Sequence, residues 1–572
     1  MSSVSDDDID KRGAGSIVDF IKLGAEDNGH SYDASVLMNT SDGFHCADYR
    51  LDQYAVDVAD FSSQYGSDYS ISYTATNITG KPRKYPEYGD FPETYAMRTY
   101  GDWWEKAPSS VHEIQPQNIP KIPAQDYIVI YFEEYVVPEE IAIFETFNPG
   151  ALIRIWAYTI TKSWICLWET EKLCIPPLQA INKARRFSPQ LKKGNLPTRT
   201  IRLEFNHSLL HYFTEIDAVL LRGRKVNIES IQRILDCYKS HQKCSILRKL
   251  QQIHFRPNIK GNYHNHLREF FTNDLNEFIT VLNRNTEVVK SDVTAEYSCK
   301  NIGFKDMPFE IILKIFSYLD LKSLFLVGQV SKSFYDVSTH PLLYSEVNLK
   351  PYWHLASSDM LCTLAKRATV LKKLDLSWCG LFNTISPTEF KKFIQQRGDN
   401  LMCLRLDSCK ILNASCIETL GIVCDNLKEL SLRNCSTDPP LLNFSCLANL
   451  KNLERLDLFQ TVIEPELMLT MLENNRKLKH LNLAYCGIAV NMDTVAHHIG
   501  QYNQGLISLD LWKSRFLSAA GLEALSKCTE LEEVDFGWCF YSDYDVTMYF
   551  KSIQFTRSIT RRQFKKITIK LY

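Results

Sequence analysis

Residues 371–379 read LKKLDLSWC, and the same spacing returns at residues 506–514 as LISLDLWKS. In both stretches leucines hold the first, fourth and sixth positions, and a small residue follows three positions after the last leucine. Seven copies of this pattern align, starting at Leu371, Leu401, Leu427, Leu453, Leu478, Leu506 and Leu531. The steps between starts are 30, 26, 26, 25, 28 and 25 residues, close to the roughly 20–29 residues of leucine-rich repeats. The sequence therefore predicts a solenoid of strand–helix units that share one core.

Weaker copies flank the array at residues 344–349 and 564–569. The run that ends at Tyr572 is read either as a closing repeat or as the end of a shorter form of such an array. The small residues that follow the last leucine-type position are Cys379, Cys409, Cys435, Thr461, Cys486, Ser514 and Cys539. Five of the 17 cysteines thus take one structural position, where they can pack inward and approach backbone groups of the turn. This column favours buried structural thiols over a metal or catalytic site.

Alternate positions of the repeat strands predict the concave face of the solenoid. Between the last two leucine-type positions stand Asp375, Arg405, Ser431, Asp457, Asn482, Asp510 and Asp535. They form either an acidic stripe that awaits a basic partner segment, or a set of side chains that bond within each repeat. Farther along the same face, Arg433, Phe459 and Trp512 have the side-chain types of interface anchors, although they would also suit packing under a covering loop. The candidate substrate-binding residues are Arg405, Arg433, Asp457, Phe459, Asp510, Trp512 and Asp535.

The composition excludes several classes of protein. The chain of 572 residues has a formal net charge of −2, which argues against a protein built around phosphate contacts with nucleic acid. An odd number of cysteines in so long a chain does not fit a small disulfide-stapled fold. The acidic start resembles neither a secretory nor a transit peptide, and we find no apolar run long enough for a transmembrane segment. We therefore expect a cytoplasmic location, with the nucleus left open.

Before the repeats, the chain divides into regions that differ in charge and in the spacing of their apolar residues. Residues 1–44 are expected to form a flexible acidic tail. Residues 45–223 carry short alternating apolar runs, at 126–132, 141–145, 152–158, 200–205 and 215–221, with turn residues between them. This pattern predicts an antiparallel β-sandwich or jelly roll. Residues 224–300 show helical spacing and predict a helical linker. A compact apolar unit spans 301–349, and the repeats fill 350–572.

The unit at 301–349 predicts two or three short helices, with Pro308 in the first turn of one and another starting near Leu321. A unit so small and apolar needs a partner or the adjoining repeats to cover it. Its residues 307–319, MPFEIILKIFSYL, and the later Leu324, Val330-Ser331-Lys332 and Phe334 resemble the F-box. Followed by repeats of the cysteine-containing kind, it is similar to the F-box/leucine-rich-repeat family of ubiquitin-ligase receptors.

The resemblance implies a non-catalytic receptor subunit that needs no cofactor or metal. The F-box would dock on a Skp adaptor, cullin and RING subunits would complete an SCF complex, and the repeats would hold a protein substrate for ubiquitination and proteasomal degradation. The implied adaptor-binding residues are Met307, Pro308, Ile311, Ile312, Ile315, Phe316, Leu319, Leu324, Val330 and Phe334. No phosphate-binding or nucleophile motif competes with this interpretation. Cys237, His241 and Cys244 have metal-like spacing but lack a fourth ligand.

The front domain narrows the resemblance. Stretches at 85–90, 98–104, 144–150 and 212–221 resemble the member of this family that carries an N-terminal discoidin-like (galactose-binding-like) domain. That likeness implies a link to the mitochondrial outer membrane and to restraint of mitophagy through mitophagy receptors as substrates. Two alternatives stay open: a carbohydrate- or lipid-binding adhesion module, with Trp103, Trp104, Trp164 and Trp168 lining a surface or packing in a core, and an F-box scaffold without ubiquitin transfer.

Overall fold

The computed structural model describes residues 49–66, 71–98, 122–172, 183–192, 196–210, 213–226, 231, 307–435, 444–486, 490–514, 517–537, 539 and 566–568. The predicted tail at 1–44, almost all of the predicted linker at 224–300 and the Cys237/His241/Cys244 group lie outside these residues. The N-terminal sheet and the F-box-to-repeat region, residues 1–227 and 309–572, belong to one compact unit.

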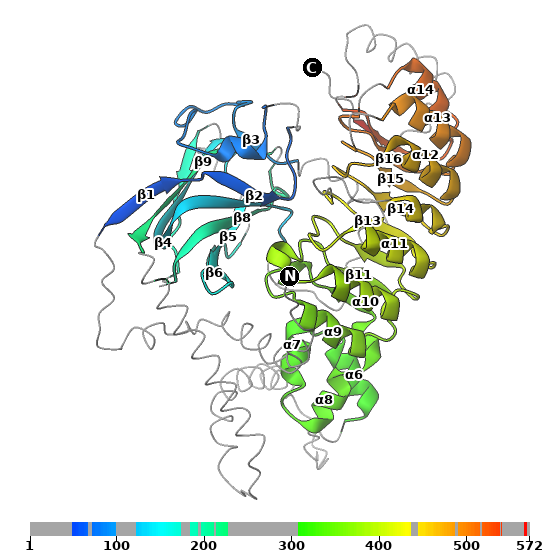
Figure 1. Ribbon diagram of the computed structural model, residues 1–572, viewed down its shortest axis with the longest axis horizontal. Coiled ribbons are helices and arrows are strands. Elements are labelled where there is room, and N and C mark those ends of the chain that lie inside the picture. The colour runs from blue at the N-terminus through cyan, green and yellow to red at the C-terminus, as the bar shows by residue number, and fades with distance from the viewer. Residues whose placement is uncertain are drawn as a thin grey trace, which may run out of the picture. The chain divides into compact units, whose positions relative to one another are not determined.

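The N-terminal region is an antiparallel sheet of nine strands in the order β1-β9-β4-β8-β5-β6, with β2 and β7 paired to β4 and β3 paired to β9 (Figure 1). Its elements are β1 (Arg50–Tyr54), β2 (Asp57–Phe61), the 3-10 helix η2 (Ala75–Ile78), β3 (Tyr95–Ala96), β4 (Asp126–Phe147), β5 (Leu152–Thr159), β6 (Trp164–Glu169), β7 (Arg185–Phe187), β8 (Thr198–Phe205) and β9 (Glu215–Lys225). The predicted antiparallel β structure is confirmed, while its division into a β-sandwich or jelly roll stays a prediction.

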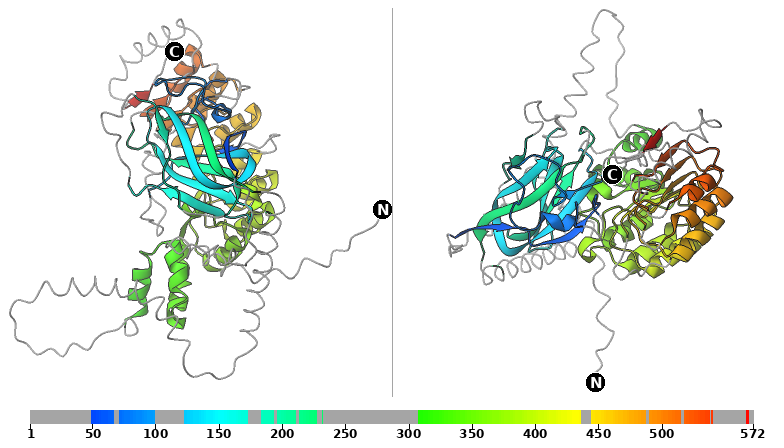
Figure 2. Two further views of the ribbon diagram at one scale, coloured as in Figure 1. Left: turned by 90° about the vertical axis from the view of Figure 1, so that its left-hand side faces the viewer. Right: turned by 90° about the horizontal axis from the view of Figure 1, so that it is seen from above.

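The first two predicted strands are one. Residues 126–132 and 141–145 both belong to the 22-residue β4, whose first half pairs with β2 and β8 and whose second half pairs mainly with β9 and with β7. Between the two predicted stretches lies Pro138, at a point where the β4–β9 register shifts. A proline lacks the N–H that the ladder needs, so it is tolerated at such a bulge. Figure 2 shows the strong twist that lets one long strand serve both groups of partners.

The repeats form a parallel sheet whose strand order follows the sequence from β10 to β18. Its strands are β10 (Glu346–Asn348), β11 (Lys373–Asp375), β12 (Cys403–Arg405), β13 (Glu429–Ser431), β14 (Arg455–Asp457), β15 (His480–Asn482), β16 (Ser508–Asp510), β17 (Glu533–Asp535) and β18 (Lys566–Thr568). The central leucine-type residue of each copy stands opposite the same residue of the next. The seven predicted copies and both flanking copies are therefore in register as aligned.

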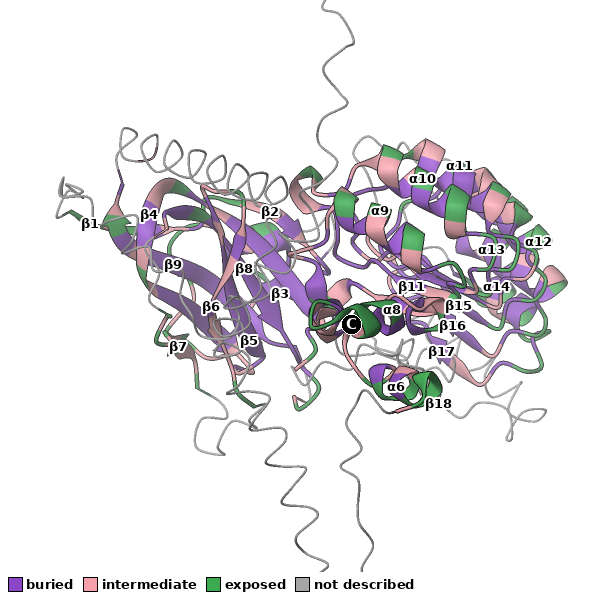
Figure 3. Ribbon diagram, turned by 90° about the horizontal axis from the view of Figure 1, so that it is seen from below, coloured by how far each residue is buried: buried purple, intermediate pink, exposed green. Residues whose placement is uncertain are grey.

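Helices return the chain between these strands along the outer side of the sheet (Figure 1). They are α9 (Ser358–Arg367), α10 (Pro387–Arg397), α11 (Ala414–Val423), α12 (Pro465–Asn474), α13 (Met492–Tyr502) and α14 (Ala519–Leu525), with 3-10 helices η6 (Lys350–Tyr352), η7 (Leu381–Asn383) and η8 (Phe444–Asn449). The repeat leucines are buried (Figure 3). Gly500 in α13 lies so close to α14 that an added Cβ would meet the Ala524 carbonyl oxygen at 2.2 Å.

The compact unit holds three helices, α6 (Phe309–Phe316), α7 (Leu321–Val327) and α8 (Lys332–Ser338), and the 3-10 helix η5 (Pro341–Tyr344). Asp320 caps α7 by accepting a hydrogen bond from the Ser323 N–H, so the predicted start near Leu321 is confirmed. The first repeat covers part of this unit: Tyr352 donates its hydroxyl to Asp320 at 2.8 Å, and the Arg367 guanidinium stacks on Phe325.

Candidate protein-binding surfaces

The predicted adaptor-binding residues of the F-box-like unit divide into two groups. Ile312, Phe316 and Leu324 are buried and form the unit's own core, where the Phe316 ring meets the half-buried Phe334 edge-on. Those three buried side chains are therefore not available as a docking surface. The helical periodicity could not separate them from the outward residues, because the apolar stripe of α6 is wide enough to cover both an inner and an outer face.

The second group points outward. Ile311 and Ile315 of α6 are 51% and 37% exposed, and Pro308 and Val330 are also exposed. Met307 and Leu319 are partly exposed. Further apolar side chains that the sequence analysis did not single out join this group: Phe309, Tyr318, Tyr335 and Leu342. So many exposed apolar side chains on a small unit indicate a surface that a partner protein covers.

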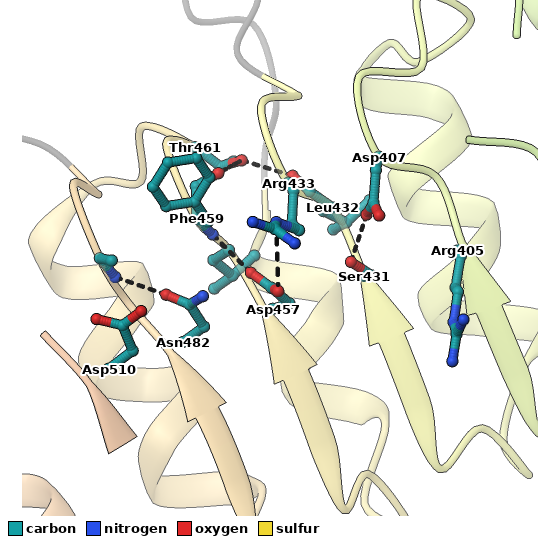
Figure 4. A network of polar contacts seen from close by, with 12 residues as sticks. Arg405, Asp407, Ser431, Leu432, Arg433, Asp457, Phe459, Thr461, Asn482 and Asp510 are labelled. Carbon is teal, nitrogen blue, oxygen red and sulfur yellow. Dashed lines mark hydrogen bonds and ion pairs between the residues drawn. The ribbon is translucent and has the colours of Figure 1, made fainter. Parts of the chain in front are cut away.

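On the concave face of the repeats, the aspartates first bond within their own repeat. One carboxylate oxygen of each accepts the backbone N–H two residues ahead at 2.8–2.9 Å, in Asp375, Asp457, Asp510 and Asp535. Asn482 does the same with its amide oxygen, and Figure 4 shows this bond and that of Asp457. The alternative of local bonding is therefore realised in every one of these repeats. The second oxygen of Asp457 faces the Arg433 guanidinium at 3.6 Å, while Arg405 pairs with Glu429 at 2.7 Å.

Phe459 and Trp512 are not exposed, contrary to the prediction of an open concave face. They are 1% and 3% exposed, because Tyr65, Tyr73, Ala96 and Phe213 of the N-terminal region pack against them in one aromatic cluster. Asp457, Asp510 and Asp535 are buried with them. The alternative weighed from the sequence, packing under a covering segment, is the correct one. The cover is the chain's own β domain.

One contact between the two regions centres on Arg98, which follows β3. Its guanidinium lies 3.9 Å from the centre of the Trp512 ring and 5.1 Å from that of Phe459. Its nitrogens reach Asp510 at 3.3 and 3.4 Å and Asp535 at 3.6 Å. We call these five residues, with Tyr65 and Lys513, the Arg98 contact. Lys513 donates from Nζ to the Tyr65 carbonyl, and the Tyr65 and Trp512 rings meet at 5.5 Å. A basic segment thus does meet the acidic stripe, and it belongs to the same chain.

A second contact lies toward the first repeats and centres on Arg202 of β8. Its guanidinium is fully buried between the rings of Tyr127 and Trp353, at 3.7 and 3.6 Å, with Trp378 at 5.0 Å. Its ion partner is Glu204 on the same strand, at 3.0 Å. Glu204 also accepts the Trp353 indole N–H at 2.9 Å. We call these five residues the Arg202 contact.

Further rings surround the Arg202 contact. Trp156 meets His354 at 4.5 Å, and Trp164 meets Trp353 at 5.1 Å. Trp164 therefore packs between the β domain and the repeats and offers no ligand-binding surface, whereas Trp168 meets Phe187 edge-on within the β domain. Trp103 and Trp104 lie outside the described residues.

The repeats present a column of left-handed residues toward the β domain. Trp378, Ser408, Asn434, Gln460, Tyr485 and Lys513 hold equivalent positions with φ between 49° and 69°. This conformation is uncommon for residues other than glycine. Members of the column reach the β domain: Trp378 meets Tyr127 edge-on, Asn434 donates to the Phe61 carbonyl at 2.7 Å, and Lys513 reaches Tyr65. This position was not predicted, because the expectations rested on the leucines, the alternate strand positions and the following cysteine.

The residues of the cysteine column are buried, as predicted, and several of them bond the preceding repeat, which the sequence did not predict. Cys435, Cys486 and Cys539 donate from Sγ to the carbonyl of the last leucine-type residue one repeat earlier, at 2.9, 3.0 and 2.8 Å. Thr461 and Ser514 do the same with hydroxyls. Burial raises the pKa of the Cys435 thiol to about 12, so it is not a thiolate at neutral pH. Such thiols are unsuited to carrying a ubiquitin thioester.

Among the described residues, no group of three or more histidine, cysteine, aspartate or glutamate side chains could hold a metal ion. Across the same residues, none of the helices has the length and apolar character to cross a membrane.

Comparison with known proteins shows the family to which this chain belongs. An F-box-like family model matches residues 304–350. F-box/LRR-repeat protein 4 of Bos taurus is 35% identical over 513 residues, which cover 85% of this chain and 75% of that protein. This chain belongs to the F-box/LRR-repeat family.

Members of this family generally act as non-catalytic substrate adaptors of ubiquitin ligases, and this F-box/LRR-repeat protein shows the two parts that give the family its name. Solved structures with partial likeness include the family 32 carbohydrate-binding module of Streptococcus pneumoniae EndoD, at 7% identity and TM-score 0.20, covering 30% of this chain and 99% of that one. The repeat protein LegL7 of Legionella pneumophila has 16% identity and TM-score 0.23, over 32% and 61%. The yeast Rad7–Elc1 complex gives 15% and 0.25, over 55% and 94%.

Proposed function

We propose that this F-box/LRR-repeat protein is the substrate-recognition subunit of an SCF-type cullin–RING ubiquitin ligase. The F-box binds a Skp adaptor, and the joined β domain and repeats receive a protein substrate that is ubiquitinated and degraded by the proteasome. The observation that carries the proposal is the outward apolar face of α6 and its neighbours, on a unit whose family match is an F-box. The protein acts by proximity, because it raises the effective concentration of substrate near the transferring enzyme.

The outward face gives a sharper test than the full predicted set. We expect Ile311→Asp/Ile315→Asp to weaken co-purification with a Skp adaptor by at least about tenfold, since it places charges in an apolar interface. A variant at Phe316 would disturb the core instead. The matched control is Ile422→Asp on α11, which gives the same change at an apolar residue that is 64% exposed in the repeats. Adaptor binding that survives in the double variant would contradict the assigned face.

Ubiquitin transfer is a separate element of the proposal. A scaffold without transfer would bind the adaptor equally well but leave the lifetimes of its partners unchanged. We expect proteins found by proximity labelling to increase when the proteasome is inhibited, and their half-lives to lengthen in cells that carry only the Ile311→Asp/Ile315→Asp variant. Half-lives equal to those with the Ile422→Asp control would favour the scaffold.

For the site of action, we propose the mitochondrial outer membrane, with mitophagy receptors as substrates and restraint of mitophagy as the result. Family resemblance supports this element. Fractionation and the same proximity labelling test it, and a protein confined to nuclei would overturn it. The adhesion-module alternative loses support, because aromatic side chains of the β domain such as Trp156 and Trp164 pack against the repeats, and the described cysteines are free thiols.

A further inference from the structure

The repeats build a complete binding site for a guanidinium group within the Arg98 contact. Asp510 and Asp535 stand on adjacent strands, each with one oxygen bonded to its own backbone. That bond fixes the carboxylate and leaves the other oxygen toward Arg98. The Trp512 ring supplies a flat surface for stacking, and Gly537 leaves it room, since a Cβ at 537 would lie 2.8 Å from Trp512 Cδ1. Paired carboxylates beside an aromatic ring are the chemistry that selects arginine.

The segment that fills this site is extended and alternates between two environments. Ala96 packs with Phe459 and Trp512, and Arg98 binds the carboxylates. The intervening Met97, like Tyr95, belongs to the core of the β domain instead. Two side chains, a small apolar residue and an arginine two positions later, therefore carry the recognition. A segment of another protein with this spacing could present the same pair.

The charges of this contact come from opposite sides of the interface. Arg98 belongs to the β domain, and both of its carboxylate partners belong to the repeats. Its nitrogen–oxygen distances of 3.3–3.6 Å exceed the 2.7–2.9 Å that is typical of strong charge-assisted bonds. Separation would leave an acidic, aromatic surface on the repeats, and such a surface attracts a basic segment. By contrast, Arg202 keeps its carboxylate partner on its own strand.

We propose that this site of Phe459, Asp510, Trp512 and Asp535 recognises an extended substrate segment with a small apolar residue two positions before an arginine. Arg98 is its resident intramolecular occupant, and a substrate binds by displacing it while the Arg202 contact holds the two regions together. The inference rests on the proposed function as a substrate receptor, whose adaptor interaction is tested separately through the F-box.

A labelled peptide with the sequence of residues 94–98, in which Tyr95 and Met97 are replaced by serine, tests the proposal on the full chain. We expect it to bind the Arg98→Glu chain at least about tenfold more tightly than wild type, because a glutamate repels Asp510 and Asp535 and vacates the site. Adding Asp510→Asn and Asp535→Asn should remove that binding. A matched peptide with citrulline in place of arginine should bind neither chain.

Two results would overturn the proposal: equal peptide binding to wild type and the Arg98→Glu chain, or equal binding of the arginine and citrulline peptides. If thermal melting shows that Arg98→Glu does not fold, Arg98→Ala takes its place with the same expected order of affinities. Adaptor co-purification by each variant is measured in parallel. If the Arg98→Glu chain binds the adaptor but not the arginine peptide, this site alone is contradicted, whereas failure of the wild-type chain to bind the adaptor contradicts the proposed function.

Discussion

The Arg202 and Arg98 contacts use the same chemistry in two different ways. In each, an arginine of the β domain lies on a tryptophan of the repeats, at 3.6 Å from Trp353 and at 3.9 Å from Trp512. They differ in the origin of the negative charge, which comes from the arginine's own strand in the first case and from the repeats in the second. The first contact joins two surfaces of balanced charge, and the second joins surfaces of opposite charge. The Arg202 contact is suited to holding the β domain and the repeats together permanently, and the Arg98 contact is suited to exchange of Arg98 for a substrate arginine.

The largest expected effect on stability tests whether the Arg202 contact holds the β domain and the repeats together. Arg202→Ala should lower the free energy of unfolding by about 2–5 kcal/mol, because it empties a fully buried space between the Tyr127 and Trp353 rings. Glu204 keeps its ion pair with Arg154 at 2.6 Å. Because the Arg202 contact is shielded from solvent, the loss should change little with ionic strength. Chemical denaturation of the full chain measures it, with Arg222→Ala as the control. Arg222 is a partly exposed arginine that pairs with Asp52 and Glu140, and its loss should cost much less, because ion pairs in contact with solvent contribute little to stability. Equal losses would contradict the role given to Arg202.

The next largest effect on stability tests whether the Arg98 contact is weak enough for Arg98 to be displaced. Arg98→Ala should cost about 1–3 kcal/mol, less than Arg202→Ala. Its cost should also change little with ionic strength, because the Arg98 and Asp510 side chains are 5% and 0% exposed. Arg98→Lys keeps the charge but loses the planar stacking group, so it should fall between alanine and wild type. A cost equal to that of Arg202→Ala would make the two contacts alike and remove the comparison.

A buried carboxyl beside the Arg98 contact adds a pH effect. Burial raises the pKa of Asp457 from 3.8 to about 7, although Arg433 opposes the shift. The folded chain therefore holds this proton more tightly than the unfolded chain does, and ionisation destabilises the fold as pH rises from about 4 through about 7. Asp457→Asn has no such titration and can keep the bond to the Phe459 N–H, as Asn482 does to Ala484.

We expect the melting temperature of Asp457→Asn to rise by a few degrees relative to wild type between about pH 5 and about pH 8. The melting temperature of Asp375→Asn provides a comparison at the equivalent position of another repeat. Burial also raises the pKa of Asp375, and its carboxylate likewise accepts the backbone N–H two residues ahead. A difference from wild type that stays constant with pH would show that Asp457 does not titrate in this range.

The smallest expected effect lies in the turns between the two contacts. Thr461 donates its hydroxyl to the Leu432 carbonyl at 2.5 Å, in the position that cysteine holds in other repeats. Thr461→Val should cost about 1 kcal/mol by removing this bond, and Thr461→Cys should cost less because a thiol can replace it. Thermal melting of both variants measures these costs. Equal costs would show that Thr461 and the cysteines at its position act by packing alone.

Periodicity predicted the repeats well because one spacing, repeated seven times, fixes both strand register and core. The burial of the turn cysteines was predicted as well, whereas their bonds to the previous repeat were not, because each of those bonds joins two repeats. The three helices of the F-box-like unit were not all predicted, and neither was the division of outward Ile311 and Ile315 from inward Ile312 and Phe316, because a wide apolar stripe does not reveal which part the fold covers. The long β4 was predicted as two strands, because its sequence contains two separate apolar runs.

The amino-acid sequence by itself determined the solenoid, its register, the F-box and the presence of an antiparallel β domain, since each depends on patterns within a few residues or one period. Only the tertiary structure decided which face of the solenoid the β domain covers. Arg98 lies 414 residues before Trp512, Arg202 lies 151 residues before Trp353, and neither arginine shares a periodic pattern with its tryptophan. Their contacts depend on two folded surfaces meeting, so Phe459, Asp510 and Trp512 become a covered site instead of an open one.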